Sequence, residues 1–239
     1  MKRLLLVNKK IQSSPAVITH RLSRLFTILL LLIVSRTTAQ DQQYKDMIDQ
    51  RVGKIVNTLG ITDSAKYKKV MSTVVTQYYT LNDMQQQSQL AIEEIKKQPA
   101  AGDALKEALA KAEDKKMSAL KQRHEVFIAH LKEDLTEEQV EKVKDGMTYR
   151  VLPITWTAYQ DMLPGLTTEQ KDKMYAWLLE ARELAMDAES SDKKHAVFGK
   201  YKGRINNYLS AAGYDMKKAG EEWQKRIKER EEKKKATGN

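Results

Sequence analysis

The 239-residue sequence contains no cysteine. The chain therefore has no disulfide framework, no thiol nucleophile, no cysteine-based metal site and no cysteine that could carry a lipid anchor. It also lacks a phosphate-binding glycine loop and a His-Glu-x-x-His motif. The usual nucleotide-binding folds and zinc hydrolases are therefore excluded as interpretations.

Histidine is scarce as well, with His124, His130 and His195 as the three that follow position 39. His124 and His130 are six residues apart, about 240° around a helix, so they cannot hold one metal ion on a shared face. A di-metal site in a helical bundle would need Glu-x-x-His on two helices, which the sequence lacks. We expect no metal and no cofactor, and we lean towards a protein that is not an enzyme.

The first 39 residues have the pattern of a secretory signal peptide. Basic residues without any acidic residue precede a ten-residue apolar run, Leu25–Val34, and the small residues Thr37 and Ala39 follow it. This pattern predicts cleavage near Ala39–Gln40. Ten helical residues extend about 15 Å, half of a hydrocarbon core, so we expect a periplasmic or secreted protein without a stable membrane anchor.

The formal net charge of +10 is concentrated at the two ends of the chain. Without residues 1–39 the chain has 35 basic and 32 acidic residues, a net charge of +3. The segment Lys217–Lys235 alone has nine basic and five acidic residues. The body between these ends is close to neutral, so we expect no nucleic-acid partner, and we expect 217–239 to form a charged helical tail.

Apolar residues recur at three- and four-residue steps through most of the chain, which predicts an all-α fold. We expect a helix over 42–59, then a long antiparallel helical hairpin over about 63–132. The hairpin is broken at Pro99–Gly102, and Asp103 is expected to be the N-cap of its second helix. Residues 40–216 are expected to form a single domain, an irregular multi-helix bundle.

A five-residue phrase occurs twice, as Leu135–Gln139 and Leu166–Gln170, with a weaker copy at Gly60–Asp63. In both strong copies a threonine precedes a glutamine by three residues, which is the pattern of a capping box at a helix start. The phrase also resembles the Leu-Thr-x-x-Gln motif of small periplasmic chaperones of the Spy and CpxP type. That resemblance implies a chaperone-like function.

The segment Ser191–Asp215 has the pattern of a helix that contains two glycines, Gly199 and Gly203. Each glycine inside a helix costs about 1 kcal/mol relative to alanine. The pair therefore indicates either a close crossing with another helix or the approach of a ligand to bare backbone. On this helix the residues expected to face the core are Val197, Tyr201, Ile205, Tyr208, Leu209 and Ala212.

Nine of the fifteen aromatic residues after position 39 lie between Tyr149 and Tyr214. Aromatic rings beside amide and cationic side chains suit sugar rings and acidic saccharides, and they equally suit an ordinary core. We assign no catalytic and no metal-binding residue. The candidate ligand-binding residues are Trp156, Tyr159, His195, Lys200, Arg204 and Asn207, with the backbone of Gly199 and Gly203 open to the ligand.

Two blocks, Val143–Gln170 and Ala185–Asp215, closely resemble a family of exported helical proteins of unknown function from Bacteroidetes. The resemblance covers most of the chain after residue 39 and is loose over 80–130. Members of that family are often associated with gene sets for the breakdown of plant polysaccharides, particularly pectin. The resemblance therefore implies a carbohydrate context, and it assigns no catalytic residue.

Three functions are consistent with the sequence. The first is an exported, non-catalytic accessory protein in polysaccharide utilisation that binds an oligosaccharide or a partner protein. The second is a Spy- or CpxP-like chaperone or stress protein with a concave apolar surface. The third is an uncharacterised carbohydrate-active enzyme in which an Asp or Glu acts with a Tyr or with His195.

Overall fold

A computed structural model describes residues 42–99 and 101–237; the predicted signal peptide and its cleavage site lie outside these residues. The contacts within the chain divide it into two units, Met1–Gln50 and Arg51–Asn239. A helix over 42–56 contains the boundary between them. Within the described residues, no helix is both long and apolar enough to cross a membrane.

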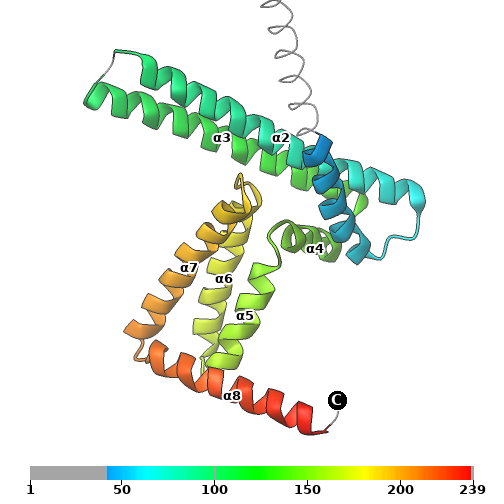
Figure 1. The fold of residues 1–239 in the computed structure, drawn as a ribbon, viewed down its shortest axis with the longest axis vertical. Coiled ribbons are helices and arrows are strands. Elements are labelled where there is room, and N and C mark those ends of the chain that lie inside the picture. The colour runs from blue at the N-terminus through cyan, green and yellow to red at the C-terminus, as the bar shows by residue number, and fades with distance from the viewer. Residues whose placement is uncertain (1–41, 100, 238–239) are drawn as a thin grey trace, which may run out of the picture. The chain divides into compact units, whose positions relative to one another are not determined.

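All regular structure in the described residues is helical, which confirms the predicted all-α class (Figure 1). A short 3-10 turn, η1 (Asn57–Leu59), ends at Gly60, whose φ of +67° is in the left-handed region that glycine tolerates best. The following helices are α2 (Ser64–Lys97), α3 (Asp103–Asp134), α4 (Glu137–Met147), α5 (Val151–Met162), α6 (Thr168–Met186), α7 (Ser191–Ala211) and α8 (Met216–Thr237).

Helices α2 and α3 lie side by side and form the predicted hairpin (Figure 1). Asp63 caps α2, because its side chain accepts a hydrogen bond from the Lys66 backbone N–H at 2.6 Å. The expected cap of α3 was wrong. Gly102, at φ +62°, is the N-cap, and Asp103 is the first helical residue, where its charge favours the helix N-terminus.

Both copies of the repeated phrase form complete capping boxes. Thr136 and Gln139 exchange hydrogen bonds at the start of α4, and Thr167 and Gln170 do so at the start of α6. The two glutamines also contact distant parts of the fold. Gln139 Nε2 donates to the Leu59 carbonyl at 2.8 Å, and Gln170 Oε1 accepts from the Tyr214 hydroxyl at 3.0 Å. The repeated phrase therefore has a structural role: it caps two helices and ties their first turns to other parts of the fold.

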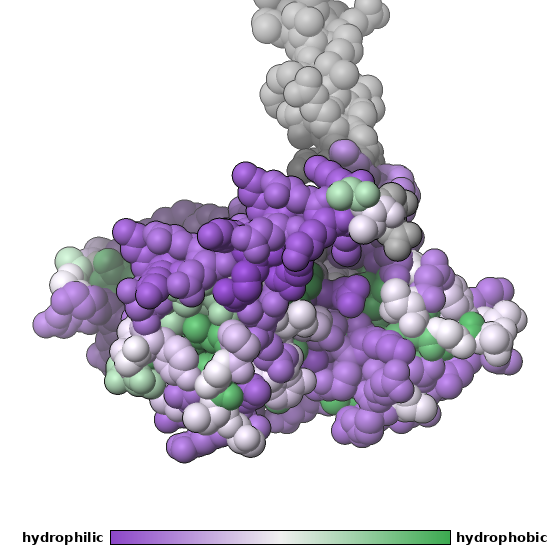
Figure 2. Space-filling view, turned by 90° about the horizontal axis from the view of Figure 1, so that it is seen from below, coloured by the Kyte–Doolittle hydropathy of each residue, from purple (hydrophilic) through white to green (hydrophobic). Residues whose placement is uncertain are grey.

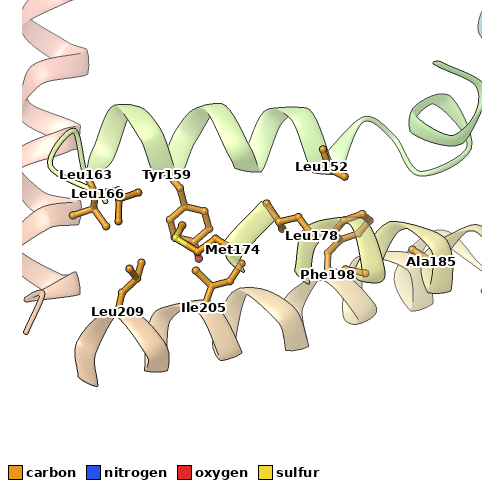
Figure 3. Packing of buried hydrophobic residues seen from close by; sticks show 11 residues of the cluster. Leu152, Tyr159, Leu163, Leu166, Met174, Leu178, Ala185, Phe198, Ile205 and Leu209 are labelled. Carbon is orange, nitrogen blue, oxygen red and sulfur yellow. The ribbon is translucent and has the colours of Figure 1, made fainter. Parts of the chain in front are cut away.

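Helices α5, α6 and α7 enclose the main apolar core (Figure 3). The predicted core-facing side of α7 is confirmed at Ile205 and Leu209, which are buried, and at Val197, Tyr201 and Tyr208, which pack half-buried against the core. It was wrong at Ala212, which is exposed, and it missed Phe198, which is buried. Phe198, Ile205 and Leu209 lie at steps of seven and four residues, so they form one face of the helix. The buried cluster comprises Leu152, Tyr159, Leu163, Leu166, Met174, Leu178, Ala181, Ala185, Phe198, Ile205 and Leu209.

The two glycines of α7 are exposed, and a Cβ atom added to either would meet nothing within 4 Å. The predicted close helix crossing at Gly199 and Gly203 is therefore wrong within the described residues. The close approach that requires a glycine lies elsewhere. A Cβ atom on Gly146 of α4 would lie 2.8 Å from a side-chain carbon of Ile55, so these two segments pack too tightly for alanine.

The charged tail is a helix that is attached to the end of α5. Asp161 accepts a hydrogen bond from the Trp223 indole at 2.7 Å and two from the Arg230 guanidinium at 3.1 and 2.6 Å. Arg226 donates to the backbone carbonyls of Asp161 and Met162. No residue of α8 is fully buried, and these polar contacts at the open carbonyl end of α5 hold it together with Met216 and Ala219, which pack partly buried against the core.

Candidate functional site

A histidine on α3 joins the hairpin to α6. His124 Nδ1 lies 2.9 Å from Asp187 Oδ2, and its Nε2 lies 3.1 Å from Glu183 Oε2. A carboxylate can only accept, so both ring nitrogens must carry a proton and the ring is an imidazolium. The hydrogen bonds to Asp187 and then Glu183 outweigh burial and raise the pKa of His124 to about 9.

Glu183 is also part of a network that includes α4. Arg182 is buried, with 2% of the residue exposed, and its guanidinium donates to Asp145 at 2.9 Å and also to Glu141 and Glu183. Burial alone would raise the pKa of Glu183. The hydrogen bond from His124 and the charges of Lys144 and Arg182 outweigh this effect and lower the pKa to about 2. Glu183 is therefore a permanent anion at the junction of three helices.

Lys194 lies buried at the C-terminal end of α6. Its Nζ donates to the carbonyls of Ala185 and Met186 at 2.8 and 2.7 Å, so it caps two carbonyls that the helix leaves open. Burial lowers the pKa of Lys194 to about 8 and outweighs the opposing charge of Asp187. The Oδ1 atom of Asp187 is buried without a hydrogen-bond partner among the described residues.

The turn before α5 packs against the same region. Tyr149 and Arg150 have φ values of +58° and +57°, and such left-handed conformations cost about 1–3 kcal/mol each for residues other than glycine. The Arg51 guanidinium lies 5.0 Å from the centre of the Tyr149 ring, and the His195 ring lies 5.3 Å from it. These contacts help to hold the side chain of Tyr149 in place.

A groove of about 1080 Å³ opens beside the His124 cluster. The ion-paired side chains of His124, Glu183 and Asp187 form one part of its surface, and apolar side chains form another. Lysines reach it from α3 and α7. Its lining includes Leu81, Met84, Met117, Leu120, Leu184 and Val197 among the apolar residues, and Lys116, Lys121, Lys193 and Lys200 among the cations.

A second surface combines aromatic and cationic side chains of α6 and α7, and we call it the aromatic face. Trp177 and Tyr208 meet edge to face, with ring centres 5.4 Å apart. The Arg204 guanidinium lies 4.3 Å from the centre of the Trp177 ring, and Lys173 Nζ lies 4.7 Å from the centre of the Tyr208 ring. Arg204 also lies 3.7 Å from Glu180. The face therefore presents two cations held over aromatic rings.

The predicted ligand-binding residues do not converge on one cleft. Of the eight, Lys200 alone lines the groove, and Arg204 alone belongs to the aromatic face. Tyr159 is buried in the core, where its hydroxyl donates to Asn206 at 2.6 Å.

The others lie apart from both surfaces. Trp156 packs against Tyr175, with ring centres 5.1 Å apart, and His195 is exposed and bonds through Nδ1 to the Ser191 carbonyl. Asn207, Gly199 and Gly203 lie on exposed parts of α7. Ligand binding by these residues stays a prediction.

Sequence reasoning missed the residues of the charged cluster. His124 falls on the apolar seam of α3, where it reads as an imperfection in the repeat. A signal was nevertheless present. Glu183 and Asp187 are four residues apart on α6, so their carboxylates share one helix face and suit a single cation between them. The partner could not be found, because it lies 59 residues earlier in the chain than Glu183.

The comparisons with known proteins place the chain in a family. Residues 45–229 match DUF3826, which is described as a protein of unknown function. The chain belongs to this family. The match covers α2 to α7 and most of α8, so the groove and the aromatic face of this DUF3826 protein both lie inside the family's region. No curated protein matches the chain.

The described residues of this DUF3826 protein contain no group of three or more His, Asp or Glu side chains placed to hold a metal ion. Figure 2 shows one side of the molecule, where hydrophilic residues predominate and hydrophobic ones appear in small separate groups. The features that distinguish the chain chemically are therefore the ion-paired groove and the aromatic face.

Proposed function

We propose that this DUF3826 protein is an exported accessory protein of polysaccharide utilisation, which binds an acidic oligosaccharide and does not cleave it. The observation that carries the proposal is the aromatic face, in which Arg204 stacks on Trp177 and Lys173 lies over Tyr208. Its position on two packed helices supports a preformed site.

The chemistry of the aromatic face suits a sugar that bears a carboxylate. The C–H faces of a pyranose ring pack against aromatic edges and faces, and a guanidinium binds a carboxylate through two parallel hydrogen bonds. Stacking on Trp177 restricts the rotation of Arg204, so less side-chain entropy is lost when a ligand binds. A neutral sugar would offer neither cation a carboxylate.

Glu180 supports this interpretation. Its carboxylate lies 3.7 Å from Arg204, and the two side chains are each 54% exposed. A contact of that length between exposed groups contributes little to stability. The pair nevertheless places a carboxylate next to the guanidinium at this position. A ligand carboxylate would compete with Glu180 for Arg204.

The test is calorimetric titration of the chain from Gln40 onward with trigalacturonate, and with maltotriose as a neutral trisaccharide of equal length. We expect binding of trigalacturonate, at least tenfold weaker binding by Arg204→Ala, and a similar loss for Trp177→Ala. The matched controls are Lys202→Ala, an exposed cation of α7, and Trp156→Ala, a tryptophan of α5 outside the aromatic face. Equal affinity for both trisaccharides, or equal losses in the controls, would contradict the proposal.

A further inference from the structure

We infer that the groove lined by α2, α3, α6 and α7 is a second binding site, separate from the aromatic face, for a small anionic amphiphile with an apolar body and a terminal carboxylate. The inference rests on the shape of the groove, on its apolar lining and on which of its charges lack partners. It does not depend on the proposed binding of oligosaccharides.

The size and lining of the groove fit a small molecule. Pockets for small ligands have volumes of roughly 300–1,000 Å³ and are mainly apolar with a few polar groups. The groove has a volume of about 1080 Å³, and apolar atoms form most of the surface that lines it. It has no aromatic residue in its lining, so it is poorly suited to stacking a sugar ring.

Two large apolar side chains remain exposed in this groove. Met117 on α3 is 48% exposed and Leu184 on α6 is 44% exposed, although both line a concave surface. An apolar ligand would remove this surface from water, at about 25 cal/mol per Å². Met84 and Met117 supply flexible, polarizable side chains that adapt to chains of different shape.

Most of the charged groups in the groove are paired with one another. Lys116 lies 3.9 Å from Glu113, Lys193 lies 4.0 Å from Glu189, and His124 is held by its two carboxylates. These groups largely compensate one another.

Three charged groups of the groove have no ion pair among the described residues. Two of them are cations, Lys121 on α3 and Lys200 on α7, and the third is an acid, Glu125. A ligand carboxylate therefore has an unpaired ammonium group available on each of two helices, beside the apolar lining. A cationic head group would meet two like charges there.

The experiment is calorimetric titration of the chain from Gln40 onward with sodium dodecanoate below its micellar concentration. Dodecyltrimethylammonium and dodecyl maltoside supply the same apolar chain with a cationic and a neutral head. The double variant Lys121→Ala/Lys200→Ala is compared with Lys115→Ala/Lys202→Ala, which removes two exposed lysines of the same helices outside the groove. Leu184→Ala is compared with Leu90→Ala, because Leu90 is 62% exposed and lies outside the groove.

We expect saturable binding of one dodecanoate per chain. The affinity should fall about three- to tenfold in Lys121→Ala/Lys200→Ala and about threefold in Leu184→Ala, while both controls stay within twofold of the parent. All six residues are exposed, so these variants are expected to fold. Absence of dodecanoate binding would overturn the inference, as would equal affinity for the three head groups. Binding to phosphatidylglycerol vesicles without binding of monomeric dodecanoate would overturn it too.

Discussion

His124 on α3 and Asp187 on α6 are joined by a hydrogen bond of 2.9 Å, and the opposite ring nitrogen of His124 faces Glu183 at 3.1 Å. The contact links the α2–α3 hairpin to α6, one of the two helices that form the aromatic face. A neutral imidazole would direct a lone pair at one of the two carboxylates. Both hydrogen bonds therefore exist together only while the ring carries a positive charge, and a neutral ring would keep one of the two.

The contribution of His124 to stability should consequently fall as the pH rises above neutrality. The pKa of His124 is about 9 in the folded state, against an ordinary value of 6.5. Its contribution is complete below pH 6.5 and is lost as the pH rises through 9, with a maximum of about 3 kcal/mol. Urea unfolding of the parent and of His124→Gln at pH 6 and pH 9.5 measures this. A difference between the two proteins that is the same at both pH values would contradict the assignment.

Lys194 should show the opposite dependence on pH. Burial lowers its pKa to about 8 from 10.5, so between these values the unfolded chain binds more protons and stability rises with pH. Lys194→Met should remove this rise. It should also cost about 1–3 kcal/mol at pH 7, because the Ala185 and Met186 carbonyls lose their partner. A Lys194→Met variant as stable as the parent would show that water replaces the ammonium group.

Alanine at Gly199 or Gly203 should stabilise the protein. Both glycines are exposed inside α7, and an added Cβ atom meets nothing within 4 Å. Each substitution should raise the free energy of unfolding by about 0.5–1 kcal/mol, through helix propensity and the entropy of the unfolded chain. Thermal unfolding of the two variants measures this, with Gly146→Ala as the comparison. Gly146→Ala should destabilise, because its Cβ atom would collide with Ile55.

Replacing Asp161 with Asn should loosen α8. The carboxylate accepts hydrogen bonds from Trp223 and Arg230, and the two partners hold it in its charged form, which lowers its pKa. Without that charge, the amide hydrogens of α8 should exchange with solvent faster, while those of α6 keep their protection. Hydrogen exchange followed by mass spectrometry compares the two helices directly. Unchanged exchange in α8 would show that apolar contacts hold it.

Much of the fold follows from local signals in the sequence. The helices begin where Asp63, Thr136, Thr167 and Ser190 place a side-chain oxygen near the first free backbone N–H groups. Each capping side chain bonds to a backbone N–H three residues later in the chain, so the sequence alone is enough to locate the cap. The N-cap of α3 was misplaced because Gly102 adopts a left-handed conformation that no neighbouring residue indicates.

The site depends on contacts between distant residues. Arg204 was selected as a candidate ligand-binding residue, and its partner Trp177 lies on another helix. Tyr159 and Trp156 were selected for their residue type, and packing placed one in the core and the other against Tyr175. Which aromatic rings remain open is decided by how helices rotate against each other. A small rotation of a helix about its axis exposes a different ring without changing the spacing of the apolar residues.

The central proposal is that Arg204 binds a carboxylate of an acidic sugar in competition with Glu180, whose carboxylate lies 3.7 Å away. The most direct test is the affinity for trigalacturonate of the parent, Glu180→Gln and Arg204→Ala. We expect Glu180→Gln to bind about two- to fivefold more tightly than the parent, because the competing charge is gone. Arg204→Ala should bind at least tenfold more weakly. Weaker binding by Glu180→Gln, or unchanged binding by Arg204→Ala, would contradict the account.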